Sequence, residues 1–383
     1  MVDQVENHKK EFGEAPILSF DVPQPTVLMG QFSDLIESNC LLCLTDQGLS
    51  LSFSPREDNI IRVVNTVRQD KKKFSYPNIK YRREDRWANA VKAILSELAK
   101  MNIKIKGYNI LVSGRGAGAD SWSLTASLYF GILHGISILE GLDLSKEKIL
   151  EMSHNANSFA PSYQAKKRDV WILLNAKPGK VYYWSERKGT GEEIPYHGFE
   201  KQSYIVSSSL PFSVLTPEED EFRIEAKDVV SEMESKSITL SDIRKLSEKE
   251  ARSMVSRYPD RERRCLTHLV VENECCQKAK DYIEKEDLAS FGKSLFSLQR
   301  SIVGNAELTS PELDWIWRRG QECDGVLGLG SIGVGIAGSF LAVVDGRASN
   351  LYARKEEEYE RIFGFRSSIR PFVPLNSPRA VRC

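Results

Sequence analysis

The chain has 383 residues, which is enough for two domains that each bury a sizeable core. Its 53 basic and 53 acidic residues balance to a formal net charge of +0, so composition indicates neither a nucleic-acid partner nor an acidic membrane surface. No apolar run has the length of a membrane helix, and residues 1–12 lack the apolar stretch of a signal peptide, so we expect a soluble cytoplasmic protein.

The first 70 residues contain short apolar runs separated by turns, a pattern typical of β-strands. In one of these runs, Leu49 to Phe53, apolar residues alternate with Ser50, Ser52 and Ser54, which predicts a half-exposed strand. The other predicted strands are Thr26 to Met29, Cys40 to Leu44 and Ile60 to Val67.

From Arg86 to Met101, apolar residues recur at helical spacing, which predicts a helix. The apolar run Tyr108 to Val112 predicts another strand, and an apolar helix is expected from about Leu124. Because strands precede helices without regular β–α–β alternation, we expect an α+β fold.

The next predicted elements are mixed, and charged helical patterns dominate from Thr216 onward. A helix is predicted at Lys146 to Met152, and strands at Val170 to Leu174 and Tyr204 to Ser207 enclose a polar loop, 178–198. Charged amphipathic helices then fill residues 218–302. The break at Leu210-Pro211 predicts two domains, 1–210 and 211–383.

Glycines are concentrated between the strand that ends at Val112 and the helix near Leu124, in the segment Ser113-Gly-Arg-Gly-Ala-Gly-Ala-Asp-Ser-Trp-Ser123. Converging backbone N–H groups and a helix start make an anion cradle, usually for phosphate. No lysine follows the last glycine, so this is not the G-x-x-x-x-G-K-[ST] loop. A strand–helix connection that merely contains three glycines is the alternative. The candidate nucleotide-binding residues are Gly114, Gly116, Ala117, Gly118, Ala119, Asp120, Ser121 and Ser123.

The order of several motifs resembles the GHMP small-molecule kinases, and specifically the galactokinase-like sugar 1-kinases. The resemblance covers most of the chain, and its most specific part is the block Pro311-Glu-Leu-Asp314. The other motifs are Trp87-Ala-Asn89-Ala-Val91, Gly116-Ala-Gly118-Ala-Asp-Ser121, His268-Leu-Val-Val-Glu272-Asn273, Phe291-Gly292 with Ser297-Leu-Gln-Arg300, and the glycine-dense run Gly325 to Gly338 with the strand Ser339 to Asp345.

The resemblance implies a two-domain GHMP-kinase fold with ATP at the domain interface. It implies that Mg-ATP donates its γ-phosphoryl group to the anomeric hydroxyl of a hexose or a hexuronic acid. Asp120 and Ser121 would contact Mg²⁺. The alternative for Asp120, Ser121 and Ser123 is to cap the following helix, which is the more frequent role of an aspartate at such a position. Gly330, Gly333 and Gly335 would form the third motif.

The motif that contacts the sugar in this family departs from its usual form, P-G-R-V-N-L-I-G-E-H-T-D. Gly30 and Asp34 are retained, and Asp34 is either a sugar contact or an ordinary turn aspartate. Pro25 stands at the arginine position, Gln31 at the glutamate position and Phe32 at the histidine position. A proline cannot stabilise charge on a transferring phosphoryl group.

The family's catalytic base, an aspartate in a loop ahead of a strand, also has no direct counterpart. Ala160 is predicted to occupy its position, with Tyr163 as a rival, and an alanine cannot accept a proton. Asp169 is a weak substitute because it directly precedes the predicted strand at Val170. His268 is expected to be a core histidine rather than a catalyst.

Two functions follow as hypotheses: a sugar 1-kinase with a weakened or rearranged centre, and a non-catalytic pseudokinase that senses a ligand or binds a protein partner. A kinase for a non-sugar alcohol is a third, which the galactokinase-like helix motifs argue against. The expected ligands are a sugar and ATP with Mg²⁺, with no nucleic acid and no membrane.

Overall fold

The computed structural model describes residues 2–76, 78–115, 123–196, 199–210, 216–333, 338–346, 353–378 and 381–382. Two compact units are present. The first comprises Met1–Pro25, Leu44–Lys177 and Leu375–Cys383, and the second comprises Thr26–Cys43 and Pro178–Pro374. The long strands β1 (Leu18–Met29) and β2 (Asn39–Arg56) contribute residues to both units. The domain boundary predicted near residue 210 stays a prediction; it lies inside the second unit.

The first unit contains a mixed sheet with the strand order β12-β1-β2-β5-β3-β4. β2 pairs antiparallel with β5, whereas β3 and β5 are parallel. This combination of a mixed sheet with separate helices confirms the predicted α+β class. The remaining strands are β3 (Ile60–Asn65), β4 (Asp70–Ser75), β5 (Gly107–Arg115) and β12 (Val381–Arg382).

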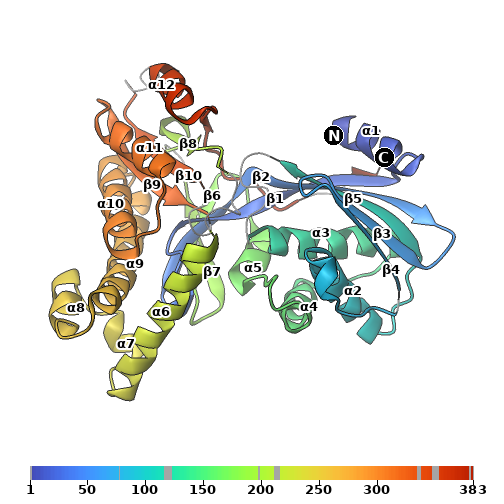
Figure 1. Cartoon of the computed structure of the whole chain (residues 1–383), viewed down its shortest axis with the longest axis horizontal. Coiled ribbons are helices and arrows are strands. Elements are labelled where there is room, and N and C mark those ends of the chain that lie inside the picture. Colours follow the sequence, from blue (N-terminus) through green and yellow to red (C-terminus); the bar gives the residue numbers. More distant parts are fainter. Residues whose placement is uncertain are drawn as a thin grey trace. The chain divides into compact units, whose positions relative to one another are not determined.

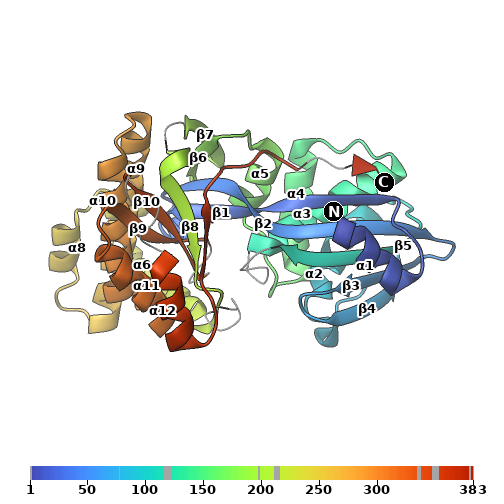
Figure 2. The same cartoon turned by 90° about the horizontal axis from the view of Figure 1, so that it is seen from above.

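Helices cover both faces of this sheet, with α1 on one face and α2, α3 and α4 on the other (Figures 1 and 2). The serine side of β2 faces α1, where His8 contacts the hydroxyls of Ser52 (2.8 Å) and Ser54 (3.0 Å). The apolar side faces α3, whose Gly135 lies against Phe53. The predicted half-exposed strand is therefore wrong, because α1 buries its polar face. The helices are α1 (Val2–Phe12), α2 (Ala88–Lys100), α3 (Ser123–Glu140), α4 (Lys146–Phe159) and α5 (Lys167–Asn175), with a 3-10 turn η2 (Arg83–Asp85).

Two sequence predictions between residues 167 and 198 are wrong. The run Val170 to Leu174 forms helix α5, which packs against α3 and α4, rather than a strand. The expected polar loop contains a hairpin, β6 (Lys180–Ser185) and β7 (Thr190–Pro195), which extends from the Asn39–Leu42 end of β2. In both segments, contacts with neighbouring elements outweigh the secondary-structure propensity of the local sequence.

The second unit has its own sheet, ordered β11-β8-β10-β9, with all pairs antiparallel. On β9, Gly328 meets Gly292 of α10, while Leu329 meets Gly320 of α11. Because neighbouring strand residues point to opposite faces, α10 and α11 cover the two faces of this sheet. The strands are β8 (Ser203–Ser207), β9 (Val326–Ile332), β10 (Ser339–Val344) and β11 (Ser368–Pro371).

Helices α6, α8 and α10 and the π-helical η5 pack against the long helix α9, which is buried along much of its length. The helices of this unit are α6 (Thr216–Ser235), α7 (Leu240–Ile243), α8 (Glu248–Met254), α9 (Asp260–Glu284), α10 (Leu288–Ser301), η5 (Ile302–Ala306), α11 (Pro311–Gln321) and α12 (Ala353–Phe363), with 3-10 turns η1 (Ser33–Leu35) and η3 (Glu200–Gln202). In the described part of the chain, no helix combines the length and apolar character needed to cross a bilayer.

Candidate functional site

A sharp turn follows β1 in the second unit, and Gly30 makes it possible. The backbone of Gly30 has φ +88°, and a Cβ atom there would lie 2.6 Å from the carbonyl oxygen of Asn39. Only glycine tolerates both the positive φ and the close approach. The turn brings residues 31–34 against the middle of α9, where Glu272 and His268 lie.

The turn is held by a buried carboxylate from α9. Glu272 accepts the backbone N–H groups of Gln31 (2.8 Å) and Phe32 (2.9 Å), one on each carboxylate oxygen. Glu272 belongs to the His268-to-Asn273 motif, so a contact more than 200 residues apart in sequence links two of the motifs quoted above. This role was not predicted.

Phe32 is fully buried in an aromatic cluster. Its ring centroid lies 4.6 Å from that of Phe222 and 5.6 Å from that of His268. Burial lowers the pKa of His268 to about 3, so this imidazole is neutral, and its Nδ1 lies 3.0 Å from the Ser301 hydroxyl. His268 is thus a core residue, as the sequence predicts.

Asp34 is exposed and held by an arginine. Arg223 of α6 places Nη1 3.1 Å from Asp34 Oδ2, donates from Nη2 to the carbonyl of Gln31 (3.2 Å) and pairs with Glu219 (3.0 Å). The guanidinium group also lies over the Phe32 ring, with 4.7 Å from its carbon to the ring centroid. Asp34 therefore has a fixed position from which it can accept a ligand hydroxyl.

The glycine-rich segment of the first unit lies largely beyond the described residues. Gly114 pairs with Leu49 near the end of β5, and α3 begins at Ser123, which confirms the predicted strand before the segment and the predicted helix after it. Gly116, Ala117, Gly118, Ala119, Asp120 and Ser121 all fall in the range 116–122, outside the described residues, so their proposed phosphate and Mg²⁺ contacts stay predictions.

The third motif is described in part. A Cβ on Gly330 would lie 3.0 Å from a methyl carbon of Leu295, so this glycine permits close packing of β9 on α10. Gly333, at φ +98°, donates its N–H to the carbonyl of Val27 (2.8 Å). Gly335 lies outside the described residues. Gly333 thus supports the backbone of β1 close to the turn at Gly30, and a ligand contact by any of the three glycines stays a prediction.

The region expected to hold the base contains a buried ion pair. Arg168 and Asp169 lie in the first turn of α5, with side chains 1% and 4% exposed and 3.5 Å between Nε and Oδ1. Asp169 is the only aspartate classed as buried among the described residues. Burying two opposite charges is costly, so this pair is weak evidence for stability and marks Asp169 as a candidate functional residue.

The other residues considered at the catalytic positions are Ala160, Pro25 and Tyr163. Ala160 is fully buried and ends α4, while Pro25 is buried in β1 at the edge of the first unit. The carbonyl of Tyr163 accepts a hydrogen bond from the Tyr129 hydroxyl (2.9 Å), and burial raises the pKa of Tyr163. The assignment of Ala160 to the base position is not tested by these contacts.

The sequence around Asp169 contains a signal for a helix start, but the strand propensity of the residues that follow it outweighed this signal in the prediction. Three basic residues, Lys166 to Arg168, directly precede Asp169, and an acidic residue in the first turn is favourable at a helix start. The run Val-Trp-Ile-Leu-Leu after it has high strand propensity, which led to the wrong element and so to the low weight of Asp169. Within the described residues, no group of three or more potential ligands could hold a metal ion.

Known proteins match this chain in sequence along nearly its whole length. A Treponema pallidum protein provisionally named galactokinase is 26% identical over 367 residues, covering 94% of this chain and 92% of its own. The galactokinase of Clostridium tetani is also 26% identical, over 377 residues, with coverage of 94% and 93%. No family model matches the sequence.

Solved structures show the same fold. Lactococcus lactis galactokinase, complexed with galactose, superposes with a TM-score of 0.84 at 19% identity and 99% coverage of both chains. Methanococcus jannaschii mevalonate kinase follows with a TM-score of 0.60, 15% identity and coverage of 93% and 98%. The chain is similar in sequence to galactokinases along nearly its whole length and has the GHMP-kinase fold.

The galactokinase-like chain nevertheless has an altered first motif. Phe32 stands at the position of the family's histidine, and its apolar ring is packed into the core against Phe222. Gln31 and Phe32 contact Glu272 through their backbone N–H groups and not through their side chains. Asp34 and Gly30 are the retained members, and both have defined structural positions.

Proposed function

We propose that this galactokinase-like chain transfers the γ-phosphoryl group of ATP to the anomeric hydroxyl of a sugar, either a hexose or a hexuronic acid. The observation that carries the proposal is the buried Arg168–Asp169 pair at the start of α5. Helix α5 packs against α3, the helix that follows the glycine-rich segment. The galactokinase relatives support the same reaction class.

Asp169 would accept the proton of the sugar hydroxyl as that oxygen attacks phosphorus, a role that this family gives to an aspartate. Proton removal by a positioned base contributes about 10²–10⁴ in rate. Arg168 lies beside the carboxylate as its ion-pair partner, with 3.5 Å between Nε and Oδ1. Its guanidinium also provides positive charge that Pro25 does not supply at the family's arginine position.

The nucleotide would be held by the segment 114–123. The strand β5 and the helix α3 on either side fit a phosphate cradle, because a helix start presents backbone N–H groups to an anion. ATP supplies the transferring group, and Mg²⁺ bound with it offsets the phosphate charge. We assign these contacts to Gly114, Gly116, Gly118 and Ser121, and the Mg²⁺ contact to Asp120 with Ser121.

Asp34 would accept a sugar hydroxyl, since its carboxylate is exposed and fixed by Arg223. Glu272 would act indirectly, by holding the backbone of the turn that carries Asp34. Phe32 adds an apolar body and no polar group, so we expect fewer hydrogen bonds to the sugar than a histidine and glutamate pair would give.

The test is ADP release from MgATP with a panel of hexoses and hexuronic acids, measured for the wild-type chain, Asp169→Asn and a control, Asp143→Asn. Asp143 is an exposed aspartate of the same unit. We expect turnover with at least one sugar, a loss of about 10²–10⁴ in kcat for Asp169→Asn, and no change for the control. Equal rates for all three proteins would remove Asp169 from the mechanism.

A non-catalytic pseudokinase is the second candidate, favoured by the buried Phe32 and by Pro25 at the arginine position. It predicts ATP or sugar binding by calorimetry without ADP release from any sugar of the panel. Restoring Arg at Pro25 and Asp at Ala160 would then leave the rate at zero, whereas a weakened kinase would gain activity.

A further inference from the structure

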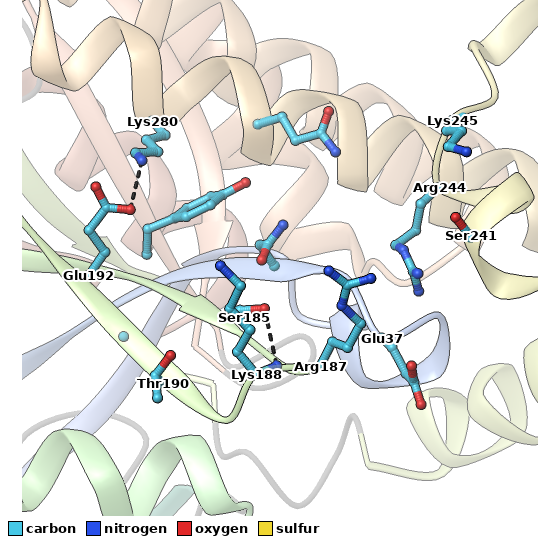
Figure 3. A pocket seen from close by; sticks show the side chains of 14 residues that line it. Glu37, Ser185, Arg187, Lys188, Thr190, Glu192, Ser241, Arg244, Lys245 and Lys280 are labelled. Carbon is cyan, nitrogen blue, oxygen red and sulfur yellow. Dashed lines mark hydrogen bonds and ion pairs between the residues drawn. The ribbon is translucent and has the colours of Figure 1, made fainter.

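A polar pocket of about 560 Å³ lies wholly in the second unit, between the β6–β7 hairpin and the helices α7 and α9 (Figure 3). Its volume is in the range of small-molecule sites. The sugar motif residue Asp34 is not among the described residues that line it.

The lining is strongly basic. Lys280 is neutralised by Glu192 at 2.7 Å. Arg187, Lys188, Arg244 and Lys245 then face a single further carboxylate, that of Glu37.

Arg187 and Lys188 lie in the hairpin turn, and neither side chain pairs with any described residue. Figure 3 shows the guanidinium groups of Arg187 and Arg244 pointing toward one another across the pocket. Cations that line one pocket repel each other, and a multiply charged anion would relieve the repulsion.

Neutral hydrogen-bonding groups complete the wall. The side chains of Asn39, Thr190, Ser241 and Gln277 line the same space. Hydroxyls and amides both donate and accept, which suits the hydroxyl groups of a polyol. The cations suit a phosphate, since arginine forks bind phosphate oxygens in pairs.

The pocket wall is rigid on one side. Arg244 donates from Nη1 to the carbonyl of Ile36 (2.6 Å), and its own carbonyl accepts from Asn273 (3.0 Å). Arg244 is therefore fixed in place by α9 and by the segment that leads into β2, so binding needs to order only Lys245 and the hairpin side chains.

We propose that this pocket binds the phosphate ester of a small polyhydroxylated compound, with Arg187, Lys188, Arg244 and Lys245 around the phosphate and the neutral side chains on the hydroxyls. The proposal does not depend on phosphoryl transfer by this chain.

The probe is sorbitol 6-phosphate, an acyclic polyol phosphate with no anomeric carbon, titrated calorimetrically into the full chain at low ionic strength, where exposed charges are least screened. Inorganic phosphate and sorbitol are titrated separately. The test variant combines Arg187→Ser, Lys188→Ser and Lys245→Ser, which leaves the bonded Arg244 in place. Lys227→Ser, an exposed lysine of α6, is the matched charge control.

We expect sorbitol 6-phosphate to bind about tenfold or more tightly than inorganic phosphate, and the triple variant to lose about tenfold or more of that affinity. The control should bind as the wild type does, and thermal unfolding of the triple variant should match it because the replaced side chains are exposed. Unchanged affinity in the triple variant, no preference over inorganic phosphate, or no heat with the wild type would each overturn the proposal.

Discussion

Gly30 is the residue on which the turn after β1 depends most directly. Gly30→Ala combines a positive φ with a Cβ placed 2.6 Å from the Asn39 carbonyl oxygen. Left-handed strain alone costs about 1 kcal/mol or more for a non-glycine residue, and the overlap adds to it. Gly364→Ala is the matched control, because Gly364 has φ +80° and open space around its Cβ. Chemical denaturation should show a clearly larger loss for Gly30→Ala; equal losses would mean that the turn adapts freely.

Glu272 satisfies two backbone N–H groups at once, and an amide cannot do so in the same way. In Glu272→Gln one of the two carboxylate oxygens becomes a donor, which leaves Gln31 or Phe32 without its acceptor. We expect a cost of about 1–3 kcal/mol in the free energy of unfolding. Glu274→Gln on the same helix removes only a surface ion pair with Lys278 and should cost less than about 1 kcal/mol. A smaller effect at Glu272 than at Glu274 would contradict this role.

At the scale of elements, the packing of α10 on β9 depends on two facing glycines. A Cβ on Gly292 would lie 2.5 Å from the carbonyl oxygen of Leu327. Gly292→Ala should therefore force the helix from the sheet and cost about 1–3 kcal/mol. Gly304→Ala, in η5 with nothing near its Cβ, should be neutral or stabilising by up to about 1 kcal/mol. Thermal denaturation of the two variants measures whether each substitution lowers or raises the stability of the protein.

The elements that the sequence identified were those with clear periodicity. Alternation of serine with apolar residues located β2, and three- or four-residue spacing located α2. Helix α5 was missed because Val-Trp-Ile-Leu-Leu favours a strand in isolation, and only packing against α3 and α4 makes it helical. The hairpin β6–β7 was missed because the charged sequence of β7 gives no apolar pattern. These two errors concealed Asp169 and the basic pocket.

The candidate site was predictable only where its residues are adjacent in sequence. Gly30 and Asp34 could be found in one motif. The contact of Glu272 with the turn and that of Arg223 with Asp34 join distant segments, and no local pattern indicates which carboxylate meets which turn.

At the scale of the molecule, each unit contains a buried neutral histidine. Burial lowers the pKa of His8, in the first unit, to about 4 and that of His268, in the second, to about 3. The unfolded chain takes up these protons from about pH 6.5, whereas the folded chain does not until far lower pH. Stability should therefore fall as pH drops below about 6.5, by up to about 1.4 kcal/mol per pH unit per histidine.

Urea unfolding at pH 7.5, 6 and 5 measures this slope. His268→Phe removes one titrating group from the second unit and should flatten the pH dependence. A slope that is unchanged in this variant would show that other groups dominate.

The identity of the product tests the proposed reaction most directly. We would incubate the wild-type chain with MgATP and the best sugar of the panel, and follow the mixture by phosphorus NMR. The account predicts that ADP appears together with a phosphate monoester whose resonance is split by the anomeric proton. A phosphate on any other carbon, or ATP that persists with every sugar, would contradict it.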